Sequence, residues 1–249
     1  MTAGPEFWVA AIAAAVFVGL SKGGLPVVGM LGVPVLALAI SPVAAAGLLL
    51  PVYVASDIVG LYAYRRAYDK RVLAILAPAA VIGIGLGWLT AAVVPERLVT
   101  GIIGAIGVAF ALTLLLRSRP EAAAGRARVG PGLFWGAITG YTSFVSHAGA
   151  PPYQVYVLPL RLEKTVYAGT TTVLFAFVNA VKLVPYWALG QLSASNLEAA
   201  AVLSVPAILA VLAGVWLVRV LPEALFFRLV TWALLLVSAR HLWEAATGG

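Results

Sequence analysis

The chain has 249 residues, of which 63% are hydrophobic and only 10% are charged. Soluble domains carry roughly 25% charged residues, so this composition excludes a water-exposed globular protein. With no Cys and two His, disulfide scaffolds, thiolate metal sites and multi-histidine clusters are excluded, and we expect no metal and no cofactor. The net charge of +7 is spread over short loops rather than one surface, so we expect no nucleic-acid partner.

Apolar segments long enough to cross a membrane follow one another along the chain. About 20 residues, at ~1.5 Å rise per residue, cross the ~30 Å hydrocarbon core of a bilayer. Each half of the chain is predicted to hold one broken segment and three spans, and the predicted fold class is an all-α polytopic membrane protein. The predicted segments are 7–40 (broken), 43–64, 72–94 and 98–116, then 133–160 (broken), 165–187, 197–218 and 224–243.

Basic residues predict the orientation of these spans. Most of the 16 Lys and Arg residues lie in four short loops, which the positive-inside rule assigns to the cytoplasm. Both termini are then predicted to be periplasmic. The segment 7–20 has no basic region before it, so we expect retained membrane structure and not a cleaved signal. The four basic loops are 65–71, 117–128, 161–164 and 219–228.

A repeat relates the two halves of the chain. The motif at 95–98 (PERL) recurs 127 positions later at 222–225 (PEAL), and Asp57 has Asn179 as its counterpart 122 positions later. Loop 65–71, which follows the span 43–64, is basic, whereas the corresponding loop 189–196 of the second half has no basic residue. Equivalent points of the two halves therefore face opposite sides of the membrane, and the repeats are predicted to have inverted topology. The predicted organisation is a first repeat 1–116, a cytoplasmic linker 117–130 and a second repeat 131–249, integrated in one transmembrane domain.

Each half also contains a Gly/Pro break surrounded by polar residues, at 19–26 and at 142–154. Inverted topology requires each broken segment to return to the side that it entered, as a re-entrant helical hairpin with its break near the membrane midplane. Pro26 and Pro151 are placed to begin the second half-helices, because proline needs no N–H partner in a first helical turn. The free N–H groups of such half-helices favour an anion. The alternative is that Gly and Pro only allow kinks and close helix packing.

Two helix faces are predicted to complete a site around the breaks. The first face consists of Phe175, Asn179, Lys182 and Tyr186, and its counterpart of Tyr53, Asp57, Gly60 and Tyr64. Interior charges are rare in membranes and usually line a transport pathway. The predicted site has three basic side chains, Lys22, Lys182 and His147, and one carboxylate, so it favours an anion over a divalent cation. The candidate substrate-binding residues are Lys22, Gly23, Gly24, Ser146, His147, Gly149, Gln154, Thr170, Asn179 and Lys182.

Several of these residues can also be explained by a purely structural role, without substrate binding. Lys182 is then only the buried counter-ion of Asp57, and Lys22 extends to the membrane interface because the first break is shallow. His147 is a hydrogen-bonded packing residue, and the threonines 170–172 satisfy backbone carbonyls of their own helix.

Several of these segments together resemble a known family. The resemblance is carried by Leu20–Pro26, by Pro42–Asp57, by the long string Ser143–Leu160, and by Lys164, Ala168-Gly169-Thr170, Asn179, Lys182 and Pro185-Tyr186. In these positions the chain resembles the sulfite exporter TauE/SafE family. The resemblance implies a bacterial inner-membrane transporter of small sulfur-containing or organic anions, such as sulfite or short sulfonates.

The sequence thus predicts a secondary transporter that exports small anions by alternating access, with Asp57 or His147 as the proton carrier. An ion gradient must supply the energy, because the chain has no Walker A loop. A passive small-anion channel is the alternative. We do not expect the chain to be an enzyme. Ser146 and His147 are a possible nucleophile and base, but adjacent side chains on a helix point about 100° apart, so these two cannot meet. The expected partners are the anion, protons and membrane lipid, and a homodimer is left open.

Overall fold

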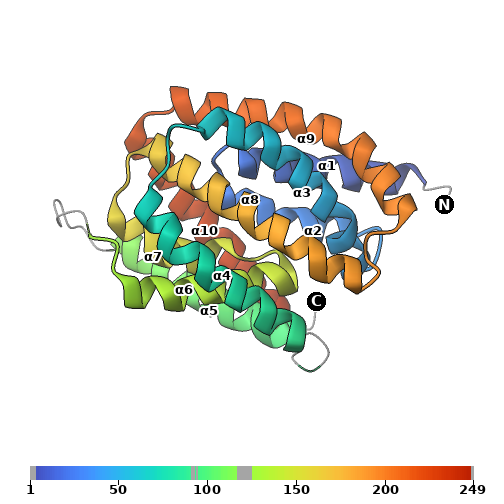
Figure 1. Cartoon of the computed structure of the whole chain (residues 1–249), viewed down its shortest axis with the longest axis horizontal. Helices are drawn as coiled ribbons and strands as arrows, with labels where there is room; N and C mark the ends of the chain where they lie inside the picture. The colour runs from blue at the N-terminus through green and yellow to red at the C-terminus, as the bar shows by residue number, and fades with distance from the viewer. Residues whose placement is uncertain (1–3, 91–92, 94, 117–124, 248–249) are drawn as a thin grey trace. The chain divides into compact units, whose positions relative to one another are not determined.

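The computed structural model describes residues 4–90, 93, 95–116 and 125–247 (Figure 1). All regular secondary structure in these ranges is helical, which confirms the predicted all-α class. The elements are α1 (Pro5–Lys22), η1 (Pro26–Leu31), α2 (Gly32–Leu36), α3 (Pro42–Tyr64), α4 (Lys70–Thr90), α5 (Glu96–Leu116), α6 (Val129–Ser146), α7 (Ala150–Val157), η2 (Leu158–Leu160), α8 (Lys164–Ala188), α9 (Ala194–Val220) and α10 (Glu223–Thr247).

Six helices in the described ranges are long and apolar enough to cross a membrane, judged by length and composition. They are the helices at Pro5–Lys22, Val43–Tyr64, Lys70–Thr90, Lys164–Ala188, Ala194–Val220 and Glu223–Thr247. Each of the eight predicted segments corresponds to an observed helix or broken helix. The chain is therefore a multi-pass membrane protein. Part of the predicted linker 117–130 lies outside the described residues.

Polar side chains mark where the long helices begin. Ser41 precedes α3, and its hydroxyl oxygen accepts the N–H of Ala44 at 3.3 Å. Asp69 precedes α4 and accepts the N–H of Val72 at 2.9 Å. The first N–H groups of a helix have no partner within the helix, so these N-caps stabilise the helix starts.

The chain divides into two compact units, each assembled from two separate stretches of sequence. Unit 1 contains Met1–Tyr68 and Ala168–Val220, and unit 2 contains Asp69–Tyr167 and Leu221–Gly249. Each unit thus combines segments from both predicted repeats and contains one of the two helix breaks.

In unit 1, the chain turns back after α1 so that η1 and α2 pack against α1, and α1 also lies along α9 (Figure 1). Glycines allow both approaches. A Cβ added at Gly29 would lie 2.7 Å from the Ser21 Cβ, and one at Gly23 would lie 2.5 Å from the Gly214 Cα. The first broken segment is therefore a helical hairpin, closely packed on α9.

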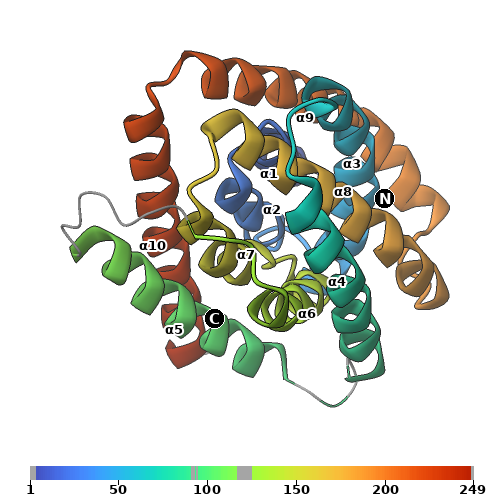
Figure 2. The ribbon, with the colours of Figure 1, turned by 60° about the vertical axis from the view of Figure 1, so that its left-hand side comes forward.

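In unit 2, α6 packs on α4, α7 folds back along α6, and α5 packs on α10 (Figure 2). The hydroxyl of Tyr156, near the end of α7, donates to the carbonyl of Arg128 at the start of α6 at 3.0 Å. A Cβ at Gly83 would overlap the carbonyl of Ala137. The second broken segment is thus also a hairpin, packed on α4 through a glycine.

The first hairpin differs from the prediction in its second arm. The sequence predicted a half-helix beginning at Pro26, but the chain forms six residues of 3₁₀-helix, η1, and then the short helix α2. Glycines at 29 and 32 and the proline at 34 explain this, because both residue types disfavour a continuous α-helix. In unit 2, α7 does begin with Pro151 and Pro152 in its first turn, as predicted.

Candidate functional site

A cluster of buried charges lies in unit 1 at the end of α1. Lys22 Nζ is 2.8 Å from Asp57 Oδ1, and Asn179 Nδ2 donates to Asp57 Oδ2 at 2.8 Å. Lys182, on α8, is 0% exposed and interacts electrostatically with both Lys22 and Asp57. We call these four residues the charged cluster. It holds two basic groups and one carboxylate inside a membrane-spanning unit.

The two predicted helix faces meet at this cluster. Asp57 lies on α3 and Asn179 on α8, and these two repeat counterparts hydrogen-bond to each other directly. On the α3 face, Tyr53, Asp57 and Tyr64 are all buried. On the α8 face, Asn179, Lys182 and Tyr186 are buried and Phe175 is half-buried.

Aromatic rings surround the Lys22 ammonium. Lys22 Nζ lies 5.1 Å from the ring centroid of Tyr53 and 5.9 Å from that of Phe175. Such distances are typical of cation–π contacts, which favour a cation in a desolvated site. Tyr53 is itself held in place, since its hydroxyl donates to the Gly29 carbonyl at 2.7 Å.

The N–H groups at the first break already have backbone partners. The N–H of Gly23 donates to Gly19, that of Gly24 to Ser21 and that of Leu25 to Leu20. With Gly24 at φ 116°, the last two bonds form a Schellman motif at the end of α1. The prediction that Gly23 and Gly24 offer free half-helix N–H groups is therefore wrong, because these groups close the preceding helix.

Side chains of α3 and α8 hold the end of α1. The Tyr64 hydroxyl donates to the Gly23 carbonyl at 2.6 Å, and the Thr172 hydroxyl donates to the Lys22 carbonyl at 3.0 Å. The absence of a Cβ at Gly60 permits this approach, since a Cβ there would lie 2.7 Å from Thr172 Cγ2. Thr172 therefore bonds to α1 and does not follow the alternative that residues 170–172 serve only their own helix; Thr170 beside it is buried.

The second break, in unit 2, has a different construction. His147 ends α6 in the left-handed region, at φ 54°, and the N–H of the next residue, Ala148, donates to the Thr142 carbonyl at 3.2 Å. The Ser146 hydroxyl donates to the same carbonyl at 3.3 Å. Gly149 follows and accepts the Tyr153 N–H at 3.3 Å.

Gln154 lies among aromatic side chains of unit 2. Its Nε2 donates to the Tyr167 hydroxyl at 3.1 Å, and both side chains are buried. The Tyr167 ring lies 5.5 Å from that of Phe227 and 6.3 Å from that of Tyr153. The amide N–H is thus engaged within the helix packing of unit 2.

Sequence reasoning did not find the pairing of Lys22 with Asp57. Lys22 is 3% exposed, so the alternative that it extends to the membrane interface is wrong. The alternative that Lys182 is the buried counter-ion of Asp57 did not include the ion pair that this carboxylate forms with Lys22. The sequence contains two interior lysines and one interior Asp, and no spacing rule chooses between them.

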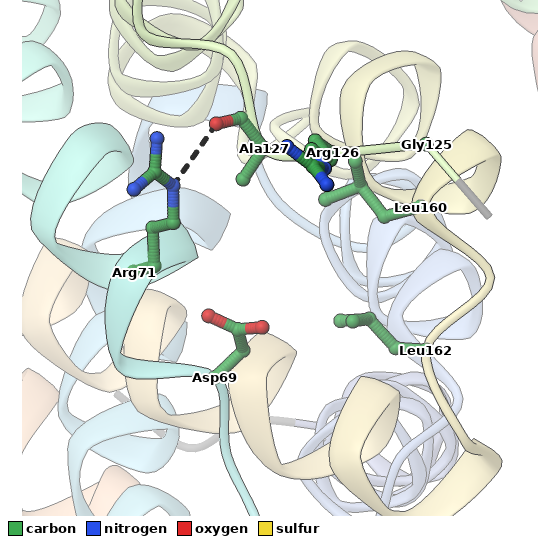
Figure 3. Close-up of a pocket in the computed structure, with 7 residues that line it drawn as sticks. All are labelled: Asp69, Arg71, Gly125, Arg126, Ala127, Leu160 and Leu162. Carbon is green, nitrogen blue, oxygen red and sulfur yellow. Dashed lines mark hydrogen bonds between the residues drawn. The ribbon is translucent and has the colours of Figure 1, made fainter.

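A pocket of about 320 Å³ also occurs in unit 2 (Figure 3). Two of its charged residues have structural contacts: Arg71 Nε donates to the Ala127 carbonyl at 3.1 Å, and Asp69 caps α4. These two contacts join α4 to the segment before α6 and cap the start of α4. The lining residues are Asp69, Arg71, Gly125, Arg126, Ala127, Leu160 and Leu162.

Comparison with known proteins assigns the chain to a family. The family model described as "Sulfite exporter TauE/SafE" matches residues 11–241. No curated protein and no solved structure matched the chain significantly. Because the family match extends over most of the chain and includes both helix breaks and the whole charged cluster, the chain belongs to the sulfite exporter TauE/SafE family.

Proposed function

We propose that the chain is a secondary transporter that exports small anions, such as sulfite, sulfonates or related organic anions, from the bacterial cytoplasm across the inner membrane. Membership in the TauE/SafE family supports transport of this class. We further propose that the charged cluster of unit 1 binds the anion and that Asp57 couples transport to the proton gradient.

The observation that carries this proposal is the charge balance of the cluster. Lys22 and Lys182 are buried together with the single carboxylate of Asp57. If all three groups are ionised, one positive charge remains in excess. A net charge within a membrane costs at least ~2.5–3.5 kcal/mol on insertion scales. A bound anion would remove this excess and accept hydrogen bonds from Asn179 and the lysines.

The substrate is expected to be small because the cluster is enclosed. Four side chains from three helices converge within unit 1, and the aromatic rings of Tyr53 and Phe175 occupy the space beside Lys22. An oxyanion with several acceptor oxygens matches a group of ammonium and amide donors. A divalent cation does not, because it prefers several carboxylate or carbonyl oxygens.

Alternating access through inverted repeats is part of the proposal. Two internal correspondences support it: each unit holds a helical hairpin packed on a long helix through glycine, α1 on α9 and α6 on α4. The repeat counterparts Asp57 and Asn179 also contact each other, as residues near a two-fold axis do. Such repeats are a recurring construction of secondary transporters.

Counterflow in proteoliposomes tests this function. The purified protein should take up labelled sulfite, sulfate, thiosulfate, sulfoacetate or lactate with saturation, and an unlabelled excess of the same anion inside should accelerate entry. Saturation with counterflow identifies a carrier, whereas a linear flux without counterflow identifies the alternative, a passive anion channel. No flux of any of these anions above that of empty liposomes would contradict the proposed function.

The orientation is tested separately. The chain has no Cys, so single cysteines at Gly4 and Thr247, both exposed, can be labelled without background. Impermeant maleimide should label both from the periplasmic face, and a cysteine at Lys70 only after membrane permeabilisation. Labelling of Gly4 and Thr247 from opposite faces would contradict the inverted-repeat topology.

A further inference from the structure

The carboxylate of Asp57 already occupies donors that a bound anion needs. One of its oxygens lies 2.8 Å from Lys22 Nζ, and the other accepts the Asn179 amide at 2.8 Å. A carboxylate and a small oxyanion accept the same hydrogen bonds from ammonium and amide groups. Asp57 and the substrate therefore compete for the same donors.

A proton on Asp57 removes this competition. The neutral carboxyl carries no charge and becomes a hydrogen-bond donor at one oxygen, so the Lys22 ammonium loses its counter-ion. The neighbouring ionisable groups are Lys22 on α1, Lys182 and Tyr186 on α8, and Tyr53 on α3. With both lysines charged and Asp57 neutral, the cluster carries two positive charges, which is strongly unfavourable in a buried site without an anion.

From this arrangement we propose that Asp57 is an internal substitute for the substrate, so that one proton and one anion bind to the cluster together and cross the membrane in the same direction. The inference rests on the proposed transport function and specifies the sign of its coupling. By thermodynamic linkage, the anion must favour proton binding by the same factor by which the proton favours anion binding.

The opposite coupling, exchange of an anion for a proton, does not fit this geometry. Exchange requires the anion to bind while Asp57 is ionised, and this places two negative groups on the same Lys22 and Asn179 donors. With same-direction coupling, an inward proton gradient opposes export. For a monovalent anion the transported pair carries no net charge, so export then proceeds when the outward gradient of the anion exceeds the inward gradient of protons. A divalent anion carries one net negative charge with its proton, so the membrane potential contributes as well.

Binding measurements over a pH series test the inference. Thiosulfate, sulfoacetate and lactate keep one charge state from mildly acidic to mildly alkaline solution, so any pH dependence belongs to the protein. For the wild type we expect affinity to rise as pH falls, by at most about tenfold per pH unit, the limit for one linked proton. Asp57→Asn should bind with nearly the same affinity at every pH, close to the wild-type value in acid.

Glu198→Gln is the matched control, because Glu198 is an exposed carboxylate in the same unit. It should retain the wild-type pH dependence. Wild-type affinity that is constant or rises with pH would overturn the inference. So would an Asp57→Asn protein that is folded, by its thermal unfolding, and still shows the full wild-type pH dependence.

A flux measurement on the wild type keeps the test independent of the variant. Entry of thiosulfate or sulfoacetate into proteoliposomes that contain a pH indicator should acidify the lumen, with one proton for each anion. Alkalinisation, or anion entry without any pH change, would overturn same-direction coupling while leaving anion transport itself established. Absence of both binding and flux for the whole anion panel would instead contradict the proposed function, and the inference with it.

Discussion

Each of the two helix breaks turns the chain back into a hairpin, but the turns are made by different residues. In unit 1 the chain leaves α1 through Gly24, at φ 116°, and a Schellman motif closes the helix end. In unit 2 the left-handed residue that ends α6 is His147, at φ 54°, and two prolines begin the next helix. Glycine adopts the left-handed region readily, whereas other L-residues there carry a cost of ~1–2 kcal/mol.

The two breaks share a hairpin topology but place side chains of different charge at the end of the first helix. Lys22 is the last residue of α1, where the negative end of the helix dipole and the Asp57 carboxylate both favour a cation. The corresponding last residue of α6 is Ser146, which bonds to its own helix. We therefore expect charge changes in unit 1 to alter transport, and packing changes to alter stability in both units.

The largest effect is expected for Lys182→Ala. This change removes half of the positive charge of the cluster, and truncating one partner of a buried charge group costs ~2–5 kcal/mol. Anion affinity should fall by at least about 30-fold, equivalent to the lower end of that range. Lys182→Arg should retain measurable binding because it keeps the charge. Binding and counterflow in proteoliposomes measure both variants.

Lys70→Ala is the control for this prediction, since Lys70 is exposed at the start of α4. It should transport as the wild type does. Removing a buried charge also weakens folding, so each variant is compared by thermal unfolding in detergent. Full uptake by a folded Lys182→Ala protein would move the anion site away from the charged cluster.

Replacing a close-packed glycine by alanine should lower the stability of the protein to a similar extent in either unit. Gly23→Ala brings a methyl group onto Gly214 of α9, and Gly83→Ala brings one onto the Ala137 carbonyl. Overpacking of this kind destabilises by ~1–3 kcal/mol. Gly85→Ala is the matched control on α4, because nothing lies within 4 Å of its added Cβ. Gly85→Ala should unfold at a higher temperature than Gly23→Ala and Gly83→Ala. Equal unfolding temperatures for all three variants would contradict the close glycine contacts.

Substitutions of His147 test whether its role at the second break is conformational. Because its φ is positive, His147→Gly should be more stable than His147→Ala by about 1 kcal/mol. If His147 has only this conformational role, His147→Gly also keeps the pH dependence of anion binding. Loss of that dependence in His147→Gly, with Asp57 intact, would make His147 the proton carrier in place of Asp57.

The smallest effect is expected for Tyr64→Phe in the first break. The change removes the hydroxyl that donates to the Gly23 carbonyl and keeps the ring. A hydrogen bond of this kind contributes ~0.5–1.5 kcal/mol, so unfolding should shift modestly and anion affinity should change less than about tenfold. A loss of transport as large as that of Lys182→Ala would mean that the end of α1 moves in the transport cycle.

Much of the fold was predictable because it depends on local composition. Long apolar stretches require helices in a membrane, and helical spacing alone identified the buried faces of α3 and α8. The position of the second helix break followed from Gly149 and Pro151. The second arm of the first hairpin was not predictable in detail, because glycines at 29 and 32 suit both a 3₁₀-helix and a close approach to α1.

By itself, the sequence determined that the chain is a helical membrane protein with two helix breaks, a few interior charges and the residues of the TauE/SafE family. Only the tertiary structure decided that Asp57 pairs with Lys22, that Asn179 binds the same carboxylate, and that the N–H groups of Gly23 and Gly24 are engaged. The physical reason is distance along the chain. Helix formation and burial follow from neighbours within a few turns, whereas an ion pair between α1 and α3 depends on how whole helices pack.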